Sequence, residues 1–364
     1  MRRILAMVLL LGIVASFGSC AAESAPVATD AVIPETVAVE TAAAETTAVE
    51  SEKTQPVLEE NLFLKVSSIT FSLVGESEDV YLGLVPREEI TWSSEDPSVV
   101  DVADGVLTAV GVGTTTIHAS YNDRQVSCTA SCLAQTQEEL EQLEPEILSA
   151  PKRLPPEVDL SKPCTYFDNS AIMGDSIVYF LWQLESKNDH LGKMTFVSRH
   201  GISLHGLVNR SKNMYFEGHE MNIEDIVAAT KAERVYIMLG CLDFQVPASK
   251  LILMDSWEQL LDRIEEKAPD TEIVIISNIP GFTEATEPTP YNIAVAETTP
   301  KLRQFAADRG YGFLDLGYYI QDHYGRMPAI YTQDEFHMND EGSLAWIKLL
   351  RFYAQFESEG GSIA

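Results

Sequence analysis

The second half of the chain alternates short apolar runs with longer segments of helical character. From about residue 166 the apolar runs are rich in β-branched residues, which predicts strands at NSAIM, MTFVS, RVYIML, TEIVIIS and YGFLDL. The segments between them predict helices at 176–186, 221–230, 256–267, 292–309 and 339–356. Strands that alternate with helices indicate a parallel sheet with helices on both faces. We therefore predict an α/β domain over residues 166–358.

The segment 61–134 has a different pattern, with a period of two. Apolar and polar residues alternate in ITWSSEDPSVVDVADGVLTAVGVGTTTIHASY, and turn-forming pairs such as Asp96-Pro97 and Asp104-Gly105 interrupt the alternation. Short strands at regular spacing predict a small all-β sandwich. The residues expected to face its interior are Trp92, Val100, Val102, Val110 and Ile117. No pair of titratable groups suggests chemistry in this segment, so we expect a spacer.

Two further segments lack a globular pattern. Residues 20–60 consist largely of Ala, Val, Thr, Glu and Pro. Such a segment cannot bury enough apolar area to offset the entropy that ordering would cost, so we predict a disordered acidic stalk, with a marginal helix as the alternative. Residues 135–165 contain a short acidic helical piece followed by prolines at 151, 155, 156 and 163, which predicts a semi-rigid linker.

Residues 1–19 have the pattern of a signal peptide. Two arginines precede an apolar stretch at 4–17, which is shorter than the roughly 20 residues that a membrane-spanning helix needs. The sequence SFGSC, which ends at Cys20, resembles the lipobox of bacterial lipoproteins, and this resemblance implies that Cys20 is lipidated. We therefore expect an exported protein anchored on the extracytoplasmic face of the cell membrane, or a secreted one if Cys20 carries no lipid.

The net charge of −30 narrows the range of partners. Nucleic acid and anionic lipid surfaces are disfavoured because like charges repel, whereas a neutral or cationic partner is compatible. Cys128 and Cys132 lie four residues apart on a predicted strand, about 13 Å from each other, which is too far for a disulfide. We expect buried free thiols at Cys128, Cys132, Cys164 and Cys241.

Three strand ends in the α/β segment carry polar and turn-forming residues. The first strand ends at Gly174-Asp175-Ser176, the second is followed by RHGIS with Gly201, and the third by GCLDF at 240–244. Because the carboxyl ends of parallel strands lie along one edge of a sheet, these loops are expected to meet. After the last strand, Asp334 and His337 stand three residues apart, just before a predicted helix. A serine, a histidine and an aspartate on one edge are what acyl transfer by an activated hydroxyl requires.

On these motifs, segment 166–358 resembles the SGNH (GDSL-type) hydrolases, which are esterases and lipases with a flavodoxin-like three-layer α/β sandwich. The GDS match implies that Ser176 is the nucleophile, and DEFH matches the final D-x-x-H block, which implies His337 as general base and Asp334 as its orienting partner. Gly201 falls where the second block supplies a backbone N–H to the oxyanion hole, beside that of Ser176. The resemblance implies no cofactor. Segment 61–134 is similar to the bacterial Ig-like domain, group 2, whose members are mostly spacers or adhesive modules.

The third block departs from the family pattern G-x-N-D. This chain has Leu242 where the family has an asparagine that donates to the oxyanion, and a leucine side chain has nothing to donate. Loss of one such donor costs about 10²–10³ in rate. The backbone N–H groups of Ser176 and Gly201 remain, and Asn209 or His205 is a further candidate donor.

Several of these residues also have a plainer interpretation. Ser176 alone would be an ordinary helix N-cap, and His337 alone a surface histidine. Asp334 and His337 together offer too few ligands for a metal site. The other polar residues of these loops are expected to be structural (Asp175, Asp243, Cys241) or to lie in solvated loops unless they line the pocket (His200, His205).

The sequence therefore predicts a surface-anchored serine esterase. Export favours substrates outside the membrane, such as O-acetyl groups of cell-wall or dietary glycans. Two alternatives remain. The first is a binding protein, in which a hydrolase domain with weakened activity is displayed on an Ig-like spacer. Leu242 motivates this alternative, because it removes an oxyanion donor. The second is an O-acyltransferase that uses the same three residues.

Overall fold

The computed structural model describes residues 62–211 and 213–362. The predicted signal peptide at 1–19, Cys20 and the predicted stalk at 20–60 lie outside the described residues. The described residues fall within one compact unit, Val57–Ala364. None of the helices in this described part is long and apolar enough to cross a membrane.

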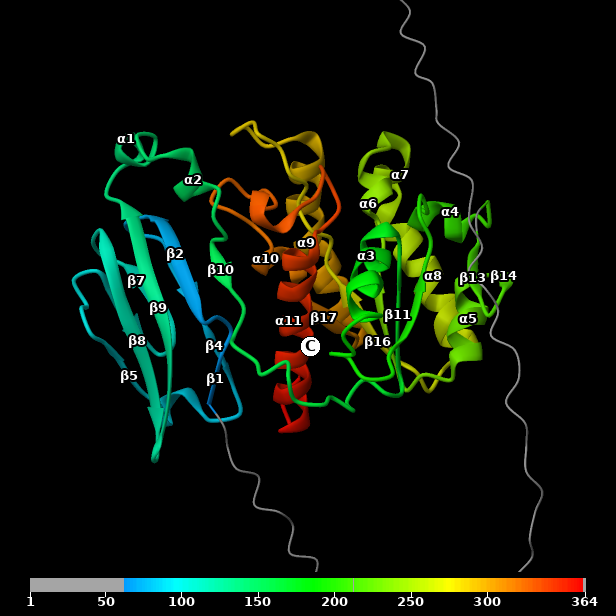
Figure 1. Cartoon of the computed structure of the whole chain (residues 1–364), viewed down its shortest axis with the longest axis horizontal. Coiled ribbons are helices and arrows are strands. Elements are labelled where there is room, and N and C mark those ends of the chain that lie inside the picture. The colour runs from blue at the N-terminus through cyan, green and yellow to red at the C-terminus, as the bar shows by residue number, and fades with distance from the viewer. Residues whose placement is uncertain (1–61, 212, 363–364) are drawn as a thin grey trace, which may run out of the picture. The chain divides into compact units, whose positions relative to one another are not determined.

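Residues 62–134 form β-strands, as the alternating pattern predicts (Figure 1). The strands are β1 (Leu62–Leu64), β2 (Ser68–Leu73), β3 (Ser77–Asp79), β4 (Tyr81–Gly83), β5 (Thr91–Ser94), β6 (Val100–Ala103), β7 (Val106–Ala109), β8 (Gly113–Tyr121) and β9 (Arg124–Ala134). One sheet has the order β10-β2-β9-β8-β5, where β10 is Arg153–Leu154, and a second has the order β3-β7-β6. Antiparallel pairing of β8 with β9 supplies the longest ladder. The Ig-like identity of this region stays a prediction.

The interior of the β region follows the predicted alternation except at one position. The predicted residues that are buried or half-buried are Trp92, Val100, Val102 and Ile117. Val110 is 45% exposed, so its prediction was wrong. Strand β7 buries Leu107 and Ala109, and the next residue therefore points to the opposite side. Cys128 and Cys132 on β9 are buried free thiols, as predicted, whereas Cys164 is a free thiol that is only half-buried, so its predicted burial was wrong.

The predicted linker at 135–165 carries secondary structure and packs on its neighbours. It contains α1 (Gln137–Leu140), α2 (Pro145–Leu148) and β10 (Arg153–Leu154), and β10 pairs antiparallel with β2. The buried Arg153 guanidinium donates to Glu78 at 2.6 Å and lies over the Tyr318 ring at 4.0 Å. The Tyr318 hydroxyl donates to the same carboxylate at 2.9 Å. Through its contacts with Glu78 and Tyr318, Arg153 connects strand β3 to the α/β segment.

The α/β segment has the predicted parallel sheet. Its strands are β11 (Ser170–Gly174), β12 (Thr195–Ser198), β15 (Arg234–Met238), β16 (Glu272–Ile276) and β17 (Gly312–Leu314). All neighbours are parallel, and the order is β12-β11-β15-β16-β17. This is the flavodoxin-like order, in which the direction of winding reverses between β11 and β15. The predicted fold class is thus confirmed for this segment.

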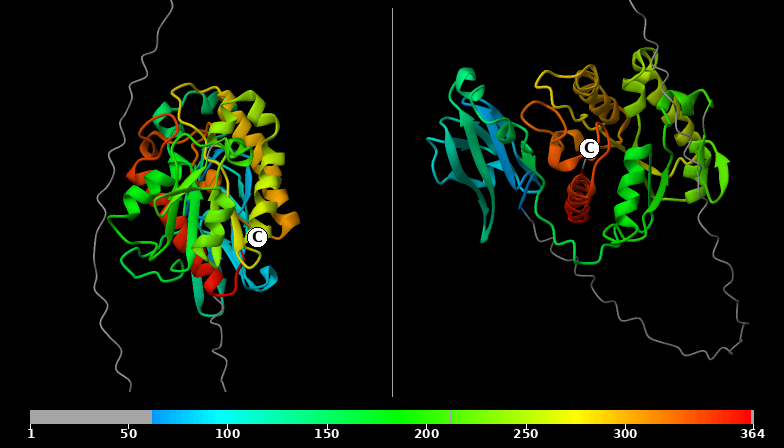
Figure 2. Two further views of the ribbon diagram at one scale, coloured as in Figure 1. Left: turned by 90° about the vertical axis from the view of Figure 1, so that its right-hand side faces the viewer. Right: turned by 45° about the horizontal axis from the view of Figure 1, so that its top comes forward.

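Helices cover both faces of this sheet (Figures 1 and 2). α3 (Ser176–Glu185) packs against α11 (Asp340–Ser358), and α8 (Leu253–Lys267) packs against α4 (Leu204–Val208) and α5 (Ile223–Thr230). Because right-handed crossovers run in opposite directions from β11 and from β15, α3 and α8 lie on opposite faces. The other elements are the hairpin β13 (Met214–Phe216) and β14 (His219–Met221), α6 (Cys241–Phe244), α7 (Pro247–Leu251), α9 (Pro290–Arg309) and α10 (Leu316–Tyr319). The five long helices begin and end within three residues of the predicted ranges.

A histidine links the β region to the α/β segment. Ser72 Oγ and His323 Nδ1 lie 2.8 Å apart. Burial lowers the pKa of His323 to about 4, and the nearby Lys152 and Arg153 lower it while Glu76 opposes them. An unfolded chain would protonate this histidine near pH 6.5. The contribution of His323 to the free energy of unfolding is therefore fully present above pH 6.5. It is lost as the pH falls towards 4, because the unfolded state binds more protons in that range.

We predict that His323→Gln, which keeps a partner for Ser72, makes stability less sensitive to acid. Between pH 7 and pH 5 the variant should lose about 1–2 kcal/mol less free energy of unfolding than the wild type, because it has no ring to protonate. Urea unfolding at the two pH values measures this difference. Equal losses in both proteins would contradict the assignment of the acid-sensitive term to His323.

Candidate active site

Ser176 stands where a buried strand passes directly into a helix. All five residues of β11 are buried, and the strand ends at Gly174. A Cβ at position 174 would lie 2.4 Å from Val178 Cγ2 and 2.5 Å from the Met238 carbonyl oxygen, so only glycine fits this crossing. Asp175 is the N-cap of α3 and accepts the Ile177 N–H at 2.9 Å. Ser176 is thus the first residue of α3, where helix N–H groups lack intrahelical acceptors and the helix dipole favours negative charge.

The structure brings Ser176, His337 and Asp334 together. His337 Nε2 lies 2.8 Å from Ser176 Oγ, and His337 Nδ1 lies 2.8 Å from Asp334 Oδ2. An ionised carboxylate can only accept hydrogen bonds, so the proton of the neutral imidazole belongs on Nδ1. Nε2 is then left to accept the hydroxyl proton of Ser176. This is the arrangement that activates a serine as a nucleophile.

The Asp334 carboxylate is held in its ionised form by local hydrogen bonds. Its Oδ1 accepts the backbone N–H groups of Phe336 and His337, both at 2.8 Å. Burial raises the pKa of Asp334, but these amide bonds and the His337 ring outweigh burial, and the pKa lies below its ordinary value. The carboxylate therefore stays charged at neutral pH.

The turn that carries Asp334 and His337 is closed by backbone bonds on both sides. Thr332 bridges to Met338, and the Thr332 hydroxyl donates to the His337 carbonyl at 2.9 Å. From outside the turn, the Phe282 N–H donates to the Glu335 carbonyl at 2.8 Å. Contacts within the turn and the contact from Phe282 thus fix the position of the imidazole.

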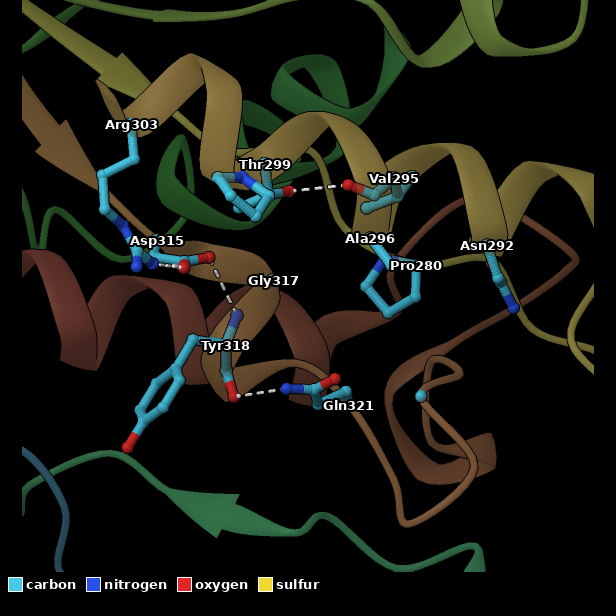
Figure 3. A pocket seen from close by; sticks show the side chains of 12 residues that line it. Pro280, Asn292, Val295, Ala296, Thr299, Arg303, Asp315, Gly317, Tyr318 and Gln321 are labelled. Atoms are coloured by element: carbon cyan, nitrogen blue, oxygen red, sulfur yellow. Dashed lines mark hydrogen bonds and ion pairs between the residues drawn. The ribbon is translucent and has the colours of Figure 1, made fainter. Parts of the chain in front are cut away.

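A cavity of about 200 Å³ lies close to this outer support (Figure 3). Its lining comes mainly from α9, α10 and the loop after β16, and includes Asn292, Arg303 and Asp315. The Asn292 side chain accepts the Gly281 N–H at 2.7 Å and donates to the Gly281 carbonyl at 3.0 Å. Gly281 directly precedes Phe282, which donates to the Glu335 carbonyl. The lining does not include the Ser176 site, so we assign this cavity no part in the chemistry.

The loop that follows β12 is positioned by a buried carboxylate. Gly201 is exposed and has a φ of +64°, a conformation that favours glycine. Asp243 is fully buried and accepts the backbone N–H groups of Leu204 at 2.7 Å and His205 at 3.1 Å. Burial raises the pKa of Asp243, and these two bonds oppose the rise. Asp243 is therefore structural, as predicted, because it fixes the start of α4 behind the Gly201 turn.

The start of the loop that carries Leu242 is held by an amide that sequence reasoning missed. Leu242 is half-buried on α6. The predicted substitute donors, Asn209 and His205, contact each other at 3.1 Å between their side-chain nitrogens. Asn278 lies two residues after the end of β16, is buried, and donates from Nδ2 to the Leu239 carbonyl at 2.9 Å. A polar residue just after an apolar strand was the signal that could have identified Asn278.

Two ionisable groups close to Ser176, the Asp175 carboxyl and the Cys241 thiol, are buried. Burial raises the pKa of Asp175 to about 6, Asp243 adds to the rise, and the Ile177 amide and His337 oppose it. The Cys241 thiol is buried, which raises its pKa, and it accepts the Tyr291 hydroxyl at 3.3 Å. A thiol with a raised pKa is a poor nucleophile, in keeping with the predicted packing role.

Of the two other histidines expected in loops, His205 lies on α4, so its prediction was wrong, and His200 lies near the imidazole of His337. The His200 and His337 rings both contact Phe180, with ring centroids 6.0 and 4.8 Å from it. Burial lowers the pKa of His200, and His337 lowers it further. Within the part of the chain that the structure describes, no cluster of three or more His, Cys, Asp or Glu residues could hold a metal ion.

Residues 172–345 match the model of the GDSL-like lipase/acylhydrolase family. No curated protein matches the chain. Among solved structures, the chain is similar to a GDSL-like lipase from Bacteroides thetaiotaomicron, with 13% identity, coverage of 53% of this chain and 90% of that chain, and a TM-score of 0.42. It is also similar to a member of the lipolytic protein G-D-S-L family from Veillonella parvula, with 16% identity, coverage of 50% and 96%, and a TM-score of 0.37. Residues 172–345 therefore form a GDSL-like lipase/acylhydrolase domain, and the protein is an ester hydrolase.

Proposed function

We propose that this hydrolase cleaves carboxylic esters with Ser176 as nucleophile, His337 as general base and Asp334 as the residue that orients the imidazole. The observation that carries the proposal is the continuous chain of two 2.8 Å contacts from hydroxyl to imidazole to carboxylate. Ser176 Oγ attacks the ester carbonyl carbon while its proton passes to His337 Nε2. The tetrahedral intermediate then expels the alcohol, which takes that proton. A water molecule, deprotonated by the same nitrogen, releases the acid from the acyl-enzyme.

The oxyanion of the intermediate is proposed to bind the backbone N–H groups of Ser176 and Gly201. The N–H of Ser176 belongs to the first turn of α3, where the helix dipole adds to its effect. Leu242 contributes no third donor. We therefore infer an enzyme that turns over slowly, and this same observation favours substrate binding as a second function of the domain.

The proposed setting is the outer face of the cell membrane, with Cys20 as the lipid-bearing residue. The signal-like segment 1–19 supports export, and the SFGSC sequence supports the anchor. The net charge of −30 disfavours anionic lipid as a substrate. The O-acetyl groups of extracellular polysaccharides combine a carboxylic ester with a neutral alcohol, and we propose them as the substrate class. Transfer of the acyl group to an alcohol instead of water would use the same three residues.

Ser176→Ala should lower the hydrolysis of p-nitrophenyl acetate by the full chain about 10⁴-fold or more, because no other group replaces the attacking oxygen. Ser186→Ala, at the other end of α3, is the matched control and should keep wild-type turnover. A serine-directed phosphonate should label Ser176 in the wild type and nothing in the variant. Equal rates for the wild type and Ser176→Ala would refute the proposed nucleophile.

Leu242→Asn should raise kcat for the same ester by at least about tenfold, since a single oxyanion donor is worth about 10²–10³ in rate. Leu251→Asn, on α7 and 86% exposed, is the control for introducing an amide and should leave kcat unchanged. Steady-state kinetics of the three proteins measures the effect. An unchanged kcat in Leu242→Asn would mean that another donor already occupies this place.

Cys20→Ala should abolish incorporation of labelled palmitate and shift the protein from the membrane fraction to the soluble exported fraction. The physical reason is that the proposed anchor consists of acyl chains on this one residue. Fractionation and metabolic labelling of expressing cells test it. Labelling that persists in the variant would contradict the anchor at Cys20.

A further inference from the structure

A row of aromatic side chains extends from the imidazole of His337 along the outer face of α3. Phe180 contacts the His337 ring at 4.8 Å between centroids, and His200 lies 6.0 Å from Phe180. Tyr179 contacts His200 at 4.3 Å, and Trp182 contacts Tyr179 at 5.5 Å. We call Tyr179, Trp182 and His200 the aromatic shelf. Its rings form one connected series, which Phe180 joins to the general base.

The helix places Tyr179 and Phe180 on the same face as Ser176. Tyr179 and Phe180 are three and four residues after Ser176, so they share its face of the helix, and long helical side chains lean towards the N-terminus. Trp182 follows Tyr179 by three residues and continues the same row. Tyr179 and Phe180 thus lie beside the nucleophile, and Trp182 lies further along the helix in contact with Tyr179.

The shelf is open to solvent, although it is aromatic. The Trp182 side chain is 42% exposed, and His200 is also exposed. Fully buried tryptophans elsewhere in the domain, Trp257 and Trp346, show where this side chain lies when it only fills the core. Exposed aromatic rings grouped beside a reactive centre point to ligand binding.

The chemistry of the reaction decides which half of the ester the shelf contacts. When the intermediate collapses, the alcohol oxygen takes its proton from His337 Nε2, so the alcohol must lie beside this ring. The shelf is joined to His337 through Phe180. The acyl group, in contrast, remains on Ser176 Oγ. The shelf therefore belongs to the alcohol side of the site.

The polar atoms of the shelf indicate a hydroxyl-bearing ring rather than a hydrocarbon chain. Its rings end in a phenol, an imidazole and an indole N–H, and the Gln183 amide donates to the Tyr179 hydroxyl at 3.2 Å. Aromatic faces can stack on the C–H face of a pyranose, while these polar tips and Gln183 can bind its hydroxyl groups. A long acyl chain would instead call for an enclosed apolar pocket.

We propose that the aromatic shelf of Tyr179, Trp182 and His200 binds the sugar ring that forms the alcohol part of the ester. This inference rests on the proposed function, because it assigns the alcohol side from the role of His337. It goes beyond that function by naming the residues that select a glycan ester over a simple one.

The test uses the full chain and two acetate esters. One is a mono-O-acetylated methyl glucopyranoside, and the other is ethyl acetate, which has no sugar ring. For Trp182→Ala the ratio of kcat/KM for the sugar ester to kcat/KM for ethyl acetate should fall about three- to tenfold, the effect of losing one stacked aromatic ring. Trp182→Phe keeps an aromatic face and should recover most of the ratio. Leu251→Ala removes an exposed apolar side chain elsewhere and should leave it unchanged. A ratio that stays at the wild-type value in Trp182→Ala overturns the proposal.

A binding measurement separates failure of the shelf from failure of the nucleophile. If the wild type and Ser176→Ala released acetate equally slowly from both esters, the proposed function would fall, and the shelf would be tested by calorimetric titration alone. Ser176→Ala is titrated with the acetylated glycoside, with and without the second substitution Trp182→Ala. A Kd at least about threefold weaker in the double variant supports the shelf, and equal Kd values overturn it.

Discussion

The hydrogen bond between the Asp334 carboxylate and His337 Nδ1 is the interaction on which the proposed chemistry depends. Because an ionised carboxylate has no proton to give, this bond assigns the ring proton to Nδ1 and leaves Nε2 as an acceptor. The opposite tautomer would present an N–H to Ser176 and deprive its hydroxyl of a base. The amides of Phe336 and His337 hold the carboxylate in its charged form. A short turn thus sets the protonation of a side chain that faces a serine 161 residues earlier in the chain.

The parallel sheet makes this meeting of distant residues possible, and buried polar contacts make it accurate. The order β12-β11-β15 places the loops with Gly201, Ser176 and Leu242 side by side at the carboxyl edge. Asp243 reaches from the third loop to the amides of the second, and Asn278 bonds the carbonyl that precedes the third. Each buried polar group here satisfies a backbone group that would otherwise be costly to bury. The strands thus determine where these loops lie, and the side-chain hydrogen bonds determine how the loops are oriented.

The sequence was sufficient for the features that depend on periodicity and topology. The five strands, the long helices and the approach of Ser176 to His337 follow from alternating β and α segments and from the rule that chemistry gathers at the carboxyl edge. Features that depend on one contact between distant segments were not accessible. The buried pair of Arg153 with Glu78 is of this kind, as is the bond from Asn278. Val110 was misplaced because one residue of phase reverses which side of a strand is buried.

Leu242 and the aromatic shelf act on different parts of the free-energy profile. A missing oxyanion donor weakens only the tetrahedral state, and so lowers kcat. The proposed stacking of a sugar ring on Trp182 would contribute in the ground state and the transition state alike, so it would lower KM and could not restore kcat. A site with both features binds its substrate well and turns it over slowly. This combination fits the proposed tethered enzyme with a polymeric substrate, because binding rather than turnover would then decide which of the proposed acetyl esters is cleaved.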